Sequence, residues 1–205
     1  LWQSYNNLFK HESVGFFETK YFFPSAKDGF DIVIGNPPYN EVSEVDYKNF
    51  FKRNYQDVLS GHYDLYIFFI KLGYNILKKG GIESYIVPHS YLEYSQFESL
   101  REFLLKNTTL IEVTDRLGSV FNSAVVDNSI MLFKKEIQNG RAKSKFSKKL
   151  YKNGLIELEA LVLSKGEFNN KSFSLTGIQN LKKLDRYISH SEQLGNITTS
   201  TQGIT

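Results

Sequence analysis

Four consecutive residues near the beginning of the chain, Asn36-Pro37-Pro38-Tyr39, could do chemistry on an aromatic amine such as that of adenine. This amine is a poor nucleophile because its lone pair is delocalised into the ring. The Asn36 side-chain carbonyl and a main-chain carbonyl can accept both amine hydrogens, which raises the electron density on nitrogen. Pro37 and Pro38 fix φ and have no N–H to donate, so they would keep the loop rigid. Tyr39 offers a flat ring for a base taken out of its stack, a contact worth about 1–3 kcal/mol.

The same tetrapeptide could also form an ordinary turn, because Asn-Pro and Pro-Pro pairs are common in turns. Its position favours a functional site instead. It directly follows residues 30–35, a short apolar run typical of a buried parallel strand. Open α/β sheets bind their ligands at the carboxyl ends of such strands.

Further elements are expected to build an α/β sheet around this strand. We predict helices over residues 63–78 and 90–106, and strands over residues 82–87, 110–113 and 125–133. Apolar side chains at Leu65, Phe69, Leu72 and Ile76 give the first helix its spacing, and Gly80-Gly81 is expected to end it. The last two strands have no crossover helix between them, so they should run antiparallel. This order is half of an open α/β sheet.

The composition narrows the class of protein. The 205 residues include no cysteine, which excludes disulfides, thiolate catalysis and cysteine-bound zinc and fits a reducing, cytoplasmic setting. No apolar stretch is long enough to span a bilayer, so we expect no membrane association. The net charge of +3 favours a polyanionic partner only slightly. Because the chain begins with Leu1 and stops at Thr205, we expect it to be part of a longer protein.

Basic residues dominate the stretch from Lys134 to Lys152, where Glu136 is the one acidic residue. Such a run usually forms a solvated loop or hairpin. Alternatively, it contacts the phosphates of a nucleic acid, for which clustered charge of one sign is the expected footprint. In that case the DNA-binding residues would be Lys143, Lys145, Lys148 and Lys149.

The segment Phe30 to Tyr39 resembles the catalytic motif of gamma-class DNA adenine-N6 methyltransferases. It is most similar to those fused to endonucleases in type IIG restriction-modification enzymes. The likeness covers most of residues 15–135. Its other parts are Phe22-Phe23-Pro24, Tyr63-Asp64-Leu65-Tyr66, Ile86-Val87-Pro88, Val120-Phe121 and, near the end, Leu194-Gly195-Asn196-Ile197.

This resemblance implies a partial Rossmann-like class I methyltransferase sheet, its catalytic half, with a C-terminal extension leading to a target recognition domain. It implies S-adenosylmethionine as cofactor and double-stranded DNA with a flipped adenine as partner. Asn36 and Pro37 would accept hydrogen bonds from the adenine amine, Tyr39 would stack on the flipped base, and Phe121 would pack on its other side. Pro38 and Phe69 would border the cofactor. Phe69 and Phe121 could instead be plain core residues. No metal is implied.

One departure from the family concerns the cofactor. The family places a glycine-rich cofactor loop and an acidic ribose-binding residue before the catalytic strand, and residues 1–35 match neither. We therefore expect the isolated chain to be inactive. The expected division is a lead-in over 1–29, the catalytic half over 30–135, a basic connector with a helix near 178–188 over 136–190, and the start of a recognition domain over 191–205.

Two other functions remain open from the residues alone. The tetrapeptide would suit any planar amine, so a protein-glutamine or RNA amino-methyltransferase is one alternative. A catalytically inactive DNA-binding fragment is the other. Because the strands that the family places upstream are absent from these residues, strand 30–35 would have an unpaired edge, which invites association. We expect residues 12–23 to cover this edge as a substitute strand, or two copies of the chain to associate there.

Overall fold

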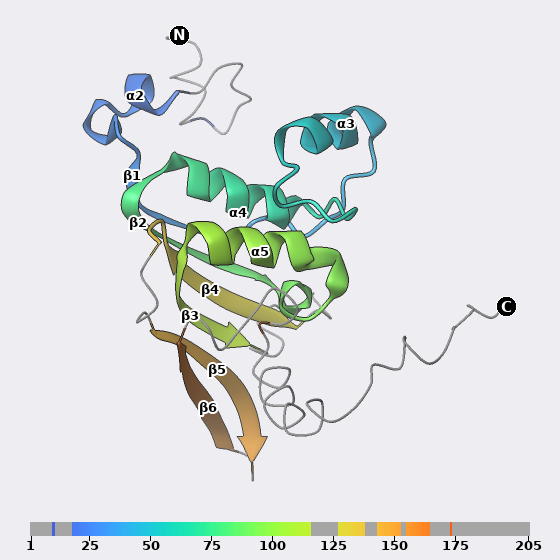
Figure 1. Ribbon diagram of the computed structural model, residues 1–205, viewed down its shortest axis with the longest axis vertical. Coiled ribbons are helices and arrows are strands. Elements are labelled where there is room, and N and C mark those ends of the chain that lie inside the picture. The colour runs from blue at the N-terminus through green and yellow to red at the C-terminus, as the bar shows by residue number, and fades with distance from the viewer. Residues whose placement is uncertain are drawn as a thin grey trace, which may run out of the picture.

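The computed structural model describes residues 10, 18–115, 127–137, 143–152, 155–164 and 173, and its strands form one six-stranded sheet (Figure 1). The strands are β1 Phe30–Gly35, β2 Leu77–Pro88, β3 Thr109–Asp115, β4 Asn128–Lys134, β5 Lys143–Lys152 and β6 Leu155–Ser164. The α-helices are α2 Thr19–Phe22, α3 Val45–Asn54, α4 Leu65–Ile76 and α5 Glu98–Asn107, and the 3-10 helices are η1 Pro24–Ala26, η2 His89–Leu92 and η3 Ser95–Phe97.

The strand order is β1-β2-β4-β3-β5-β6. β1 and β2 are parallel, and β4 lies antiparallel between β2 and β3. The chain passes from β2 through α5 to β3 and leaves one strand position between them. β4 fills this position by returning directly from β3, as the lack of a crossover helix predicted. The α/β sheet expected from the sequence is therefore confirmed.

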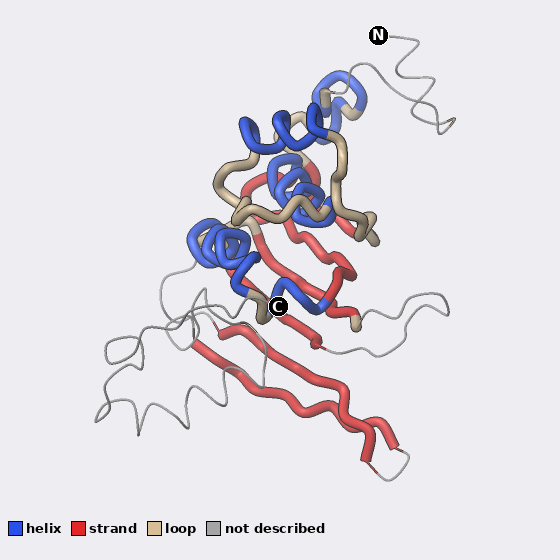
Figure 2. The backbone as a smooth tube through the Cα atoms, turned by 90° about the vertical axis from the view of Figure 1, so that its right-hand side faces the viewer, coloured by secondary structure: helices blue, strands red, loops and turns tan. Residues whose placement is uncertain are grey.

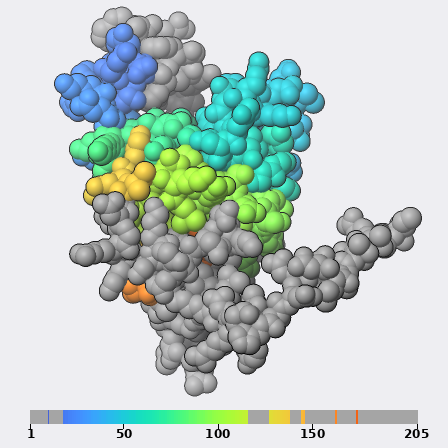
Figure 3. Space-filling model, viewed as in Figure 1, coloured from blue at the N-terminus to red at the C-terminus, as the bar shows by residue number. Residues whose placement is uncertain are grey.

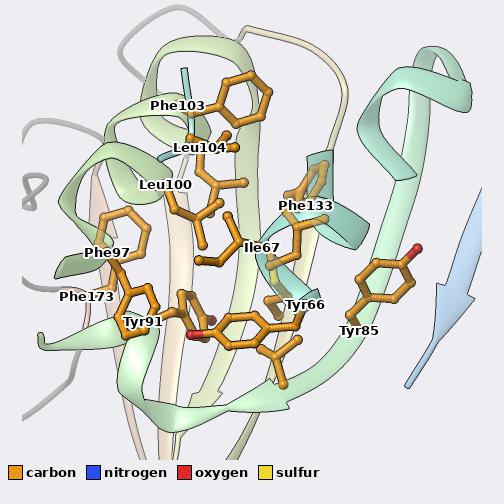
Figure 4. Packing of buried hydrophobic residues seen from close by; sticks show 14 of the residues in the cluster. Tyr66, Ile67, Tyr85, Tyr91, Phe97, Leu100, Phe103, Leu104, Phe133 and Phe173 are labelled. Atoms are coloured by element: carbon orange, nitrogen blue, oxygen red, sulfur yellow. The ribbon is translucent and has the colours of Figure 1, made fainter. Parts of the chain in front are cut away.

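Helices α4 and α5 pack on the same face of the sheet (Figure 2), and most of the core lies between these helices and β2, β4 and β3. The residues of this core include Ile70, Leu77, Val87, Leu100, Met131 and Phe133 (Figure 4). Fully burying one such side chain stabilises the fold by about 1.5–3 kcal/mol. Phe173 joins the same cluster, and its main-chain N–H donates to the Leu92 carbonyl at 2.7 Å.

The buried face of α4 differs from the spacing expected. Phe69 and Leu72 are 37% and 43% exposed, whereas Tyr66, Ile67 and Ile70 are buried. The helix is apolar on several sides, so its own pattern does not determine which side meets the sheet. Packing against β2 decides this, and it leaves an apolar stripe of α4 open.

The boundary between α4 and β2 was also predicted incorrectly. α4 ends at Ile76 and β2 begins at Leu77, so Gly80 and Gly81 lie inside the strand and do not end the helix. Gly80 has a φ of +79°, and a Cβ on Gly81 would lie 2.9 Å from the carbonyl oxygen of Phe30. Gly81 therefore allows the close approach of β1, where the register of the β1–β2 pair shifts, and Gly80 supplies the positive φ.

The second predicted helix begins later than expected. η2 and η3 precede α5, which starts at Glu98, so Ser90 does not cap it. Its predicted apolar side is confirmed, because Leu92, Phe97, Leu100 and Leu104 are all buried. The predicted helix over 178–188 lies outside the described residues.

Helix α3 was not anticipated from the sequence. It stands beside α4 as a protruding region (Figure 3), and its Phe51 ring stacks on Phe68 of α4 with centroids 3.6 Å apart. Tyr55 meets the same Phe68 ring edge-on at 5.3 Å. These aromatic contacts attach α3 to the helical layer.

The basic stretch forms part of a hairpin. β5 pairs antiparallel with β6 and parallel with β3, so the sheet continues beyond residue 135. This fits the hairpin alternative that the charge run left open.

Strand β1 lies at one end of the strand order, and within the described residues it pairs with β2 alone. Its Ile32 and Ile34 side chains are 65% and 79% exposed. The expected substitute strand is wrong for residues 19–22, which form the helix α2. Residues 12–17 of that prediction lie outside the described part.

Glu83 is fully buried on β2. It faces Gly73 of α4, where an added Cβ would overlap its carboxylate. Neither carboxyl oxygen has a hydrogen-bond partner among the described residues. Burial raises the pKa of Glu83 to about 9. Because the pKa is higher in the folded than in the unfolded chain, the unfolded state ionises first as pH rises, and stability falls above the unfolded pKa of about 4.5.

We predict that Glu83→Gln stabilises the fold at pH 8 by a few kcal/mol, since each pKa unit corresponds to about 1.4 kcal/mol. At pH 4 the substitution should change little, because Glu83 is neutral in both states there. Urea unfolding at the two pH values measures the difference, with Glu44→Gln, at an exposed residue, as control. An equal effect of Glu83→Gln at both pH values would contradict the prediction.

Candidate active site at the carboxyl edge of the sheet

The Asn-Pro-Pro-Tyr loop, residues 36–39, leaves the sheet at the carboxyl end of β1, where the sequence predicted it. In the β1–β2 register Gly35 lies opposite Tyr85, so the loop emerges beside the last residues of β2. A Cβ at residue 35 would lie 3.2 Å from Tyr85 Cε1. Glycine at this position therefore lets the Tyr85 ring pack against the strand directly before the loop. Figure 4 shows Tyr85 on the side of the core cluster that faces β1.

The loop is anchored at its centre and at its far end. Pro37 is buried, whereas Asn36 and Pro38 on either side of it are exposed. The Leu65 N–H donates to the Asn40 carbonyl at 3.0 Å, which ties the loop to the first turn of α4. The side chain of Asn36 is thus open to a ligand while the main chain beside it is held.

Tyr39 is half-buried, and its hydroxyl donates to the Ile86 carbonyl of β2 at 3.3 Å. Burial raises the pKa of Tyr39. The phenol therefore stays protonated as a donor, and the hydrogen bond fixes the direction of the ring. A fixed flat ring beside Asn36 suits stacking on a planar ligand.

The two residues expected to border the cofactor are open. Pro38 is exposed, and Phe69 is exposed one turn after the start of α4. Exposed apolar side chains can accept a flat, partly apolar group such as the adenine of S-adenosylmethionine. The chemistry of these two side chains therefore fits this cofactor.

A second polar group at the same edge was missed in the sequence. His89, directly after β2, places Nδ1 2.6 Å from Asp115 Oδ1 at the end of β3, and Nε2 3.3 Å from Glu93 Oε2. Nearby, the Tyr66 and Ser90 hydroxyls are 3.3 Å apart. The sequence feature that could have predicted this contact is the position of His89 and Asp115 at the carboxyl ends of two predicted strands. Nothing in the sequence indicated that the two residues would meet.

The structure describes the other predicted site residues, Phe121 and four lysines, only in part. Phe121 lies outside the described residues. Lys143, Lys145, Lys148 and Lys149 belong to β5. Lys145 forms an ion pair with Glu112 of β3 at 2.7 Å. The side chains of the other three lysines lie outside what the structure describes.

No group of His, Asp and Glu residues in the described part of the chain is arranged to hold a metal ion. No helix in that part is long and apolar enough to cross a membrane.

The sheet places the Asn-Pro-Pro-Tyr loop beside two parallel strands, β1 and β2, and β4 runs antiparallel between β2 and β3. Residues 2–121 match the model of the Eco57I restriction-modification methylase family, and the chain belongs to this family.

Individual relatives agree with this assignment. The chain is 29% identical over 178 residues to the type II restriction enzyme and methyltransferase RM.Eco57I of Escherichia coli, covering 82% of this chain and 17% of that protein. It is 33% identical over 84 residues to the adenine-specific methyltransferase BrxX of Escherichia coli, covering 40% of this chain and 7% of that protein. The chain thus spans less than a fifth of the length of both relatives.

Among solved structures, the fold is similar to that of the type IIG restriction endonuclease BpuSI. The TM-score is 0.56 at 17% sequence identity, covering 78% of this chain and 22% of that one. At this identity the likeness concerns the fold.

Proposed function

We propose that the protein containing this chain transfers a methyl group from S-adenosylmethionine to the N6 nitrogen of adenine in double-stranded DNA, within a restriction-modification enzyme. The observation that carries the proposal is the Asn-Pro-Pro-Tyr loop, anchored at the carboxyl end of β1 with Asn36 exposed. Relatives named as a restriction enzyme and methyltransferase and as an adenine-specific methyltransferase support DNA adenine as the substrate over RNA or protein glutamine. A DNA substrate also fits the cytoplasmic setting expected from the cysteine-free composition.

In this mechanism the chain orients the amine. The Asn36 carbonyl and the Pro37 main-chain carbonyl accept the two amine hydrogens, which moves the nitrogen toward tetrahedral geometry and frees its lone pair. Tyr39 holds the ring of the flipped adenine by stacking, while its hydroxyl remains bound to Ile86. S-adenosylmethionine supplies a methyl group on a positively charged sulfur when bound. Pro38 and Phe69 form the apolar surface for its adenine, and Phe121 packs on the other side of the flipped base.

Asn36→Ala in the full-length protein should abolish adenine methylation and leave DNA affinity within a few fold, since Asn36 acts on the amine and contributes little to phosphate binding. Methyl transfer from radiolabelled S-adenosylmethionine and filter binding of the duplex measure the two quantities. Asn40→Ala, at the residue directly after the loop, is the matched control. Near-normal methylation by Asn36→Ala would refute the proposed function.

We also propose that the lysines of β5 contact DNA phosphates. Lys145 already has a carboxylate partner in Glu112, so it should contribute least. Changing Lys143, Lys145, Lys148 and Lys149 to Gln should lower the slope of log affinity against log salt by about 0.9 per lost contact. Titration of the duplex at several salt concentrations gives the slope, and the exposed Lys106→Gln serves as control. An unchanged slope would assign these lysines to a merely solvated hairpin.

Finally, we propose that a second copy covers the open edge of β1 when the chain is expressed by itself. Ile32 and Ile34 on β1 and Phe69 and Leu72 on α4 are all exposed, and the β1 main chain has one strand partner among the described residues. Apolar side chains around an unpaired edge favour association.

The association can be tested by sedimentation of the 205-residue chain. We expect a dimer that Ile34→Lys converts to a monomer, because a charge on this face opposes burial. Val162→Lys is the matched control, since Val162 is 55% exposed on β6, at the other end of the strand order. A monomeric wild-type chain would refute the association.

A further inference from the structure

His89 lies where three strands of the sheet meet at the catalytic edge. It is the first residue after β2, its ring contacts Asp115 at the end of β3, and its main-chain N–H donates to the Asp127 carbonyl just before β4 at 2.8 Å. The His89 and Asp115 side chains are 11% and 2% exposed. A single side chain therefore joins the ends of β2 and β3 across the intervening β4.

Both ring nitrogens of His89 face carboxylate oxygens. Nδ1 is 2.6 Å from Asp115, and Nε2 is 3.3 Å from Glu93, which follows η2. Carboxylates only accept hydrogen bonds, and imidazole donates from both nitrogens only when it is protonated. The geometry thus matches an imidazolium held between two carboxylates.

The end of β2 that His89 fixes is also the support of the Asn-Pro-Pro-Tyr loop. The carbonyl of Ile86 accepts the Tyr39 hydroxyl, and Ile86 lies in β2 three residues before His89. Tyr85, one residue earlier, pairs with Gly35 of β1. A shift of the β2 end would therefore move the Tyr39 ring relative to Asn36. Displacements of about 1 Å at a reacting centre can lower a rate about a hundredfold.

We propose that His89 is a positioning residue for methyl transfer: clamped between Asp115 and Glu93, it fixes the end of β2 and through Ile86 the orientation of Tyr39. This inference rests on the proposed function. His89 acts through the main chain, so it should affect turnover more than DNA binding.

The test measures methylation by the full-length protein. His89→Ala should lower kcat by about tenfold to a hundredfold with the KM for DNA within about twofold. His89→Gln keeps one donor for Asp115 and should recover part of the loss.

Controls separate positioning from general destabilisation. Asp115→Asn should lower kcat in the same way, whereas Asp57→Asn, which removes a carboxylate 2.7 Å from Lys71, should not. Should His89→Ala fail to fold, the kcat of Asp115→Asn decides. A wild-type kcat in His89→Ala or in Asp115→Asn would overturn the inference. If Asn36→Ala also retains methylation, the proposed function itself fails.

Discussion

The parallel pairing of β1 with β2 is the interaction on which the candidate site depends. Its register sets Gly35 beside Tyr85, so the loop leaves the sheet next to Ile86, whose carbonyl accepts the Tyr39 hydroxyl. A slip of one residue would turn every side chain of β1 to the other face and remove the loop from this acceptor. Main-chain hydrogen bonds between β1 and β2 and the absence of a side chain at residue 35 therefore set the position of the loop without a ligand.

Buried polar groups lie both at the carboxyl edge of β2 and in its middle. At the edge His89 contacts Asp115, and Arg101 of α5 donates to the Tyr91 and Tyr94 carbonyls at 2.7 and 2.8 Å, which fixes the turn after the strand. The Asn128 side chain at the same edge and the Glu83 carboxyl in the middle of β2 have no hydrogen-bond partner among the described residues. Buried polar groups cost free energy unless hydrogen-bonded, so both places carry a penalty that the apolar core offsets.

The sequence predicted those parts of the structure that depend on neighbouring residues alone. The tetrapeptide, its strand and the antiparallel return of β4 follow from residue types and from the short connection after β3. The open face of α4 did not follow, because a helix that is apolar on several sides is oriented by what it packs against. The contact between His89 and Asp115 depends on β4 separating two strands far apart in sequence, and the burial of Glu83 depends on Gly73 of another element. Such pairs exist only after the sheet has assembled.

The Asn-Pro-Pro-Tyr loop directly follows β1, the strand that forms the open sheet edge. Ile34, 79% exposed, is two residues before Asn36, and within the described residues β1 is held on one side by β2 alone. A strand paired on one side has more freedom than one paired on both, and the main chain of Asn36 shares that freedom. A second copy or another part of a longer protein that paired with this edge would limit the motion of β1. It would thereby also limit the motion of the carbonyls proposed to bind the amine. Association at the edge and the geometry of the site are therefore coupled through the β1 main chain.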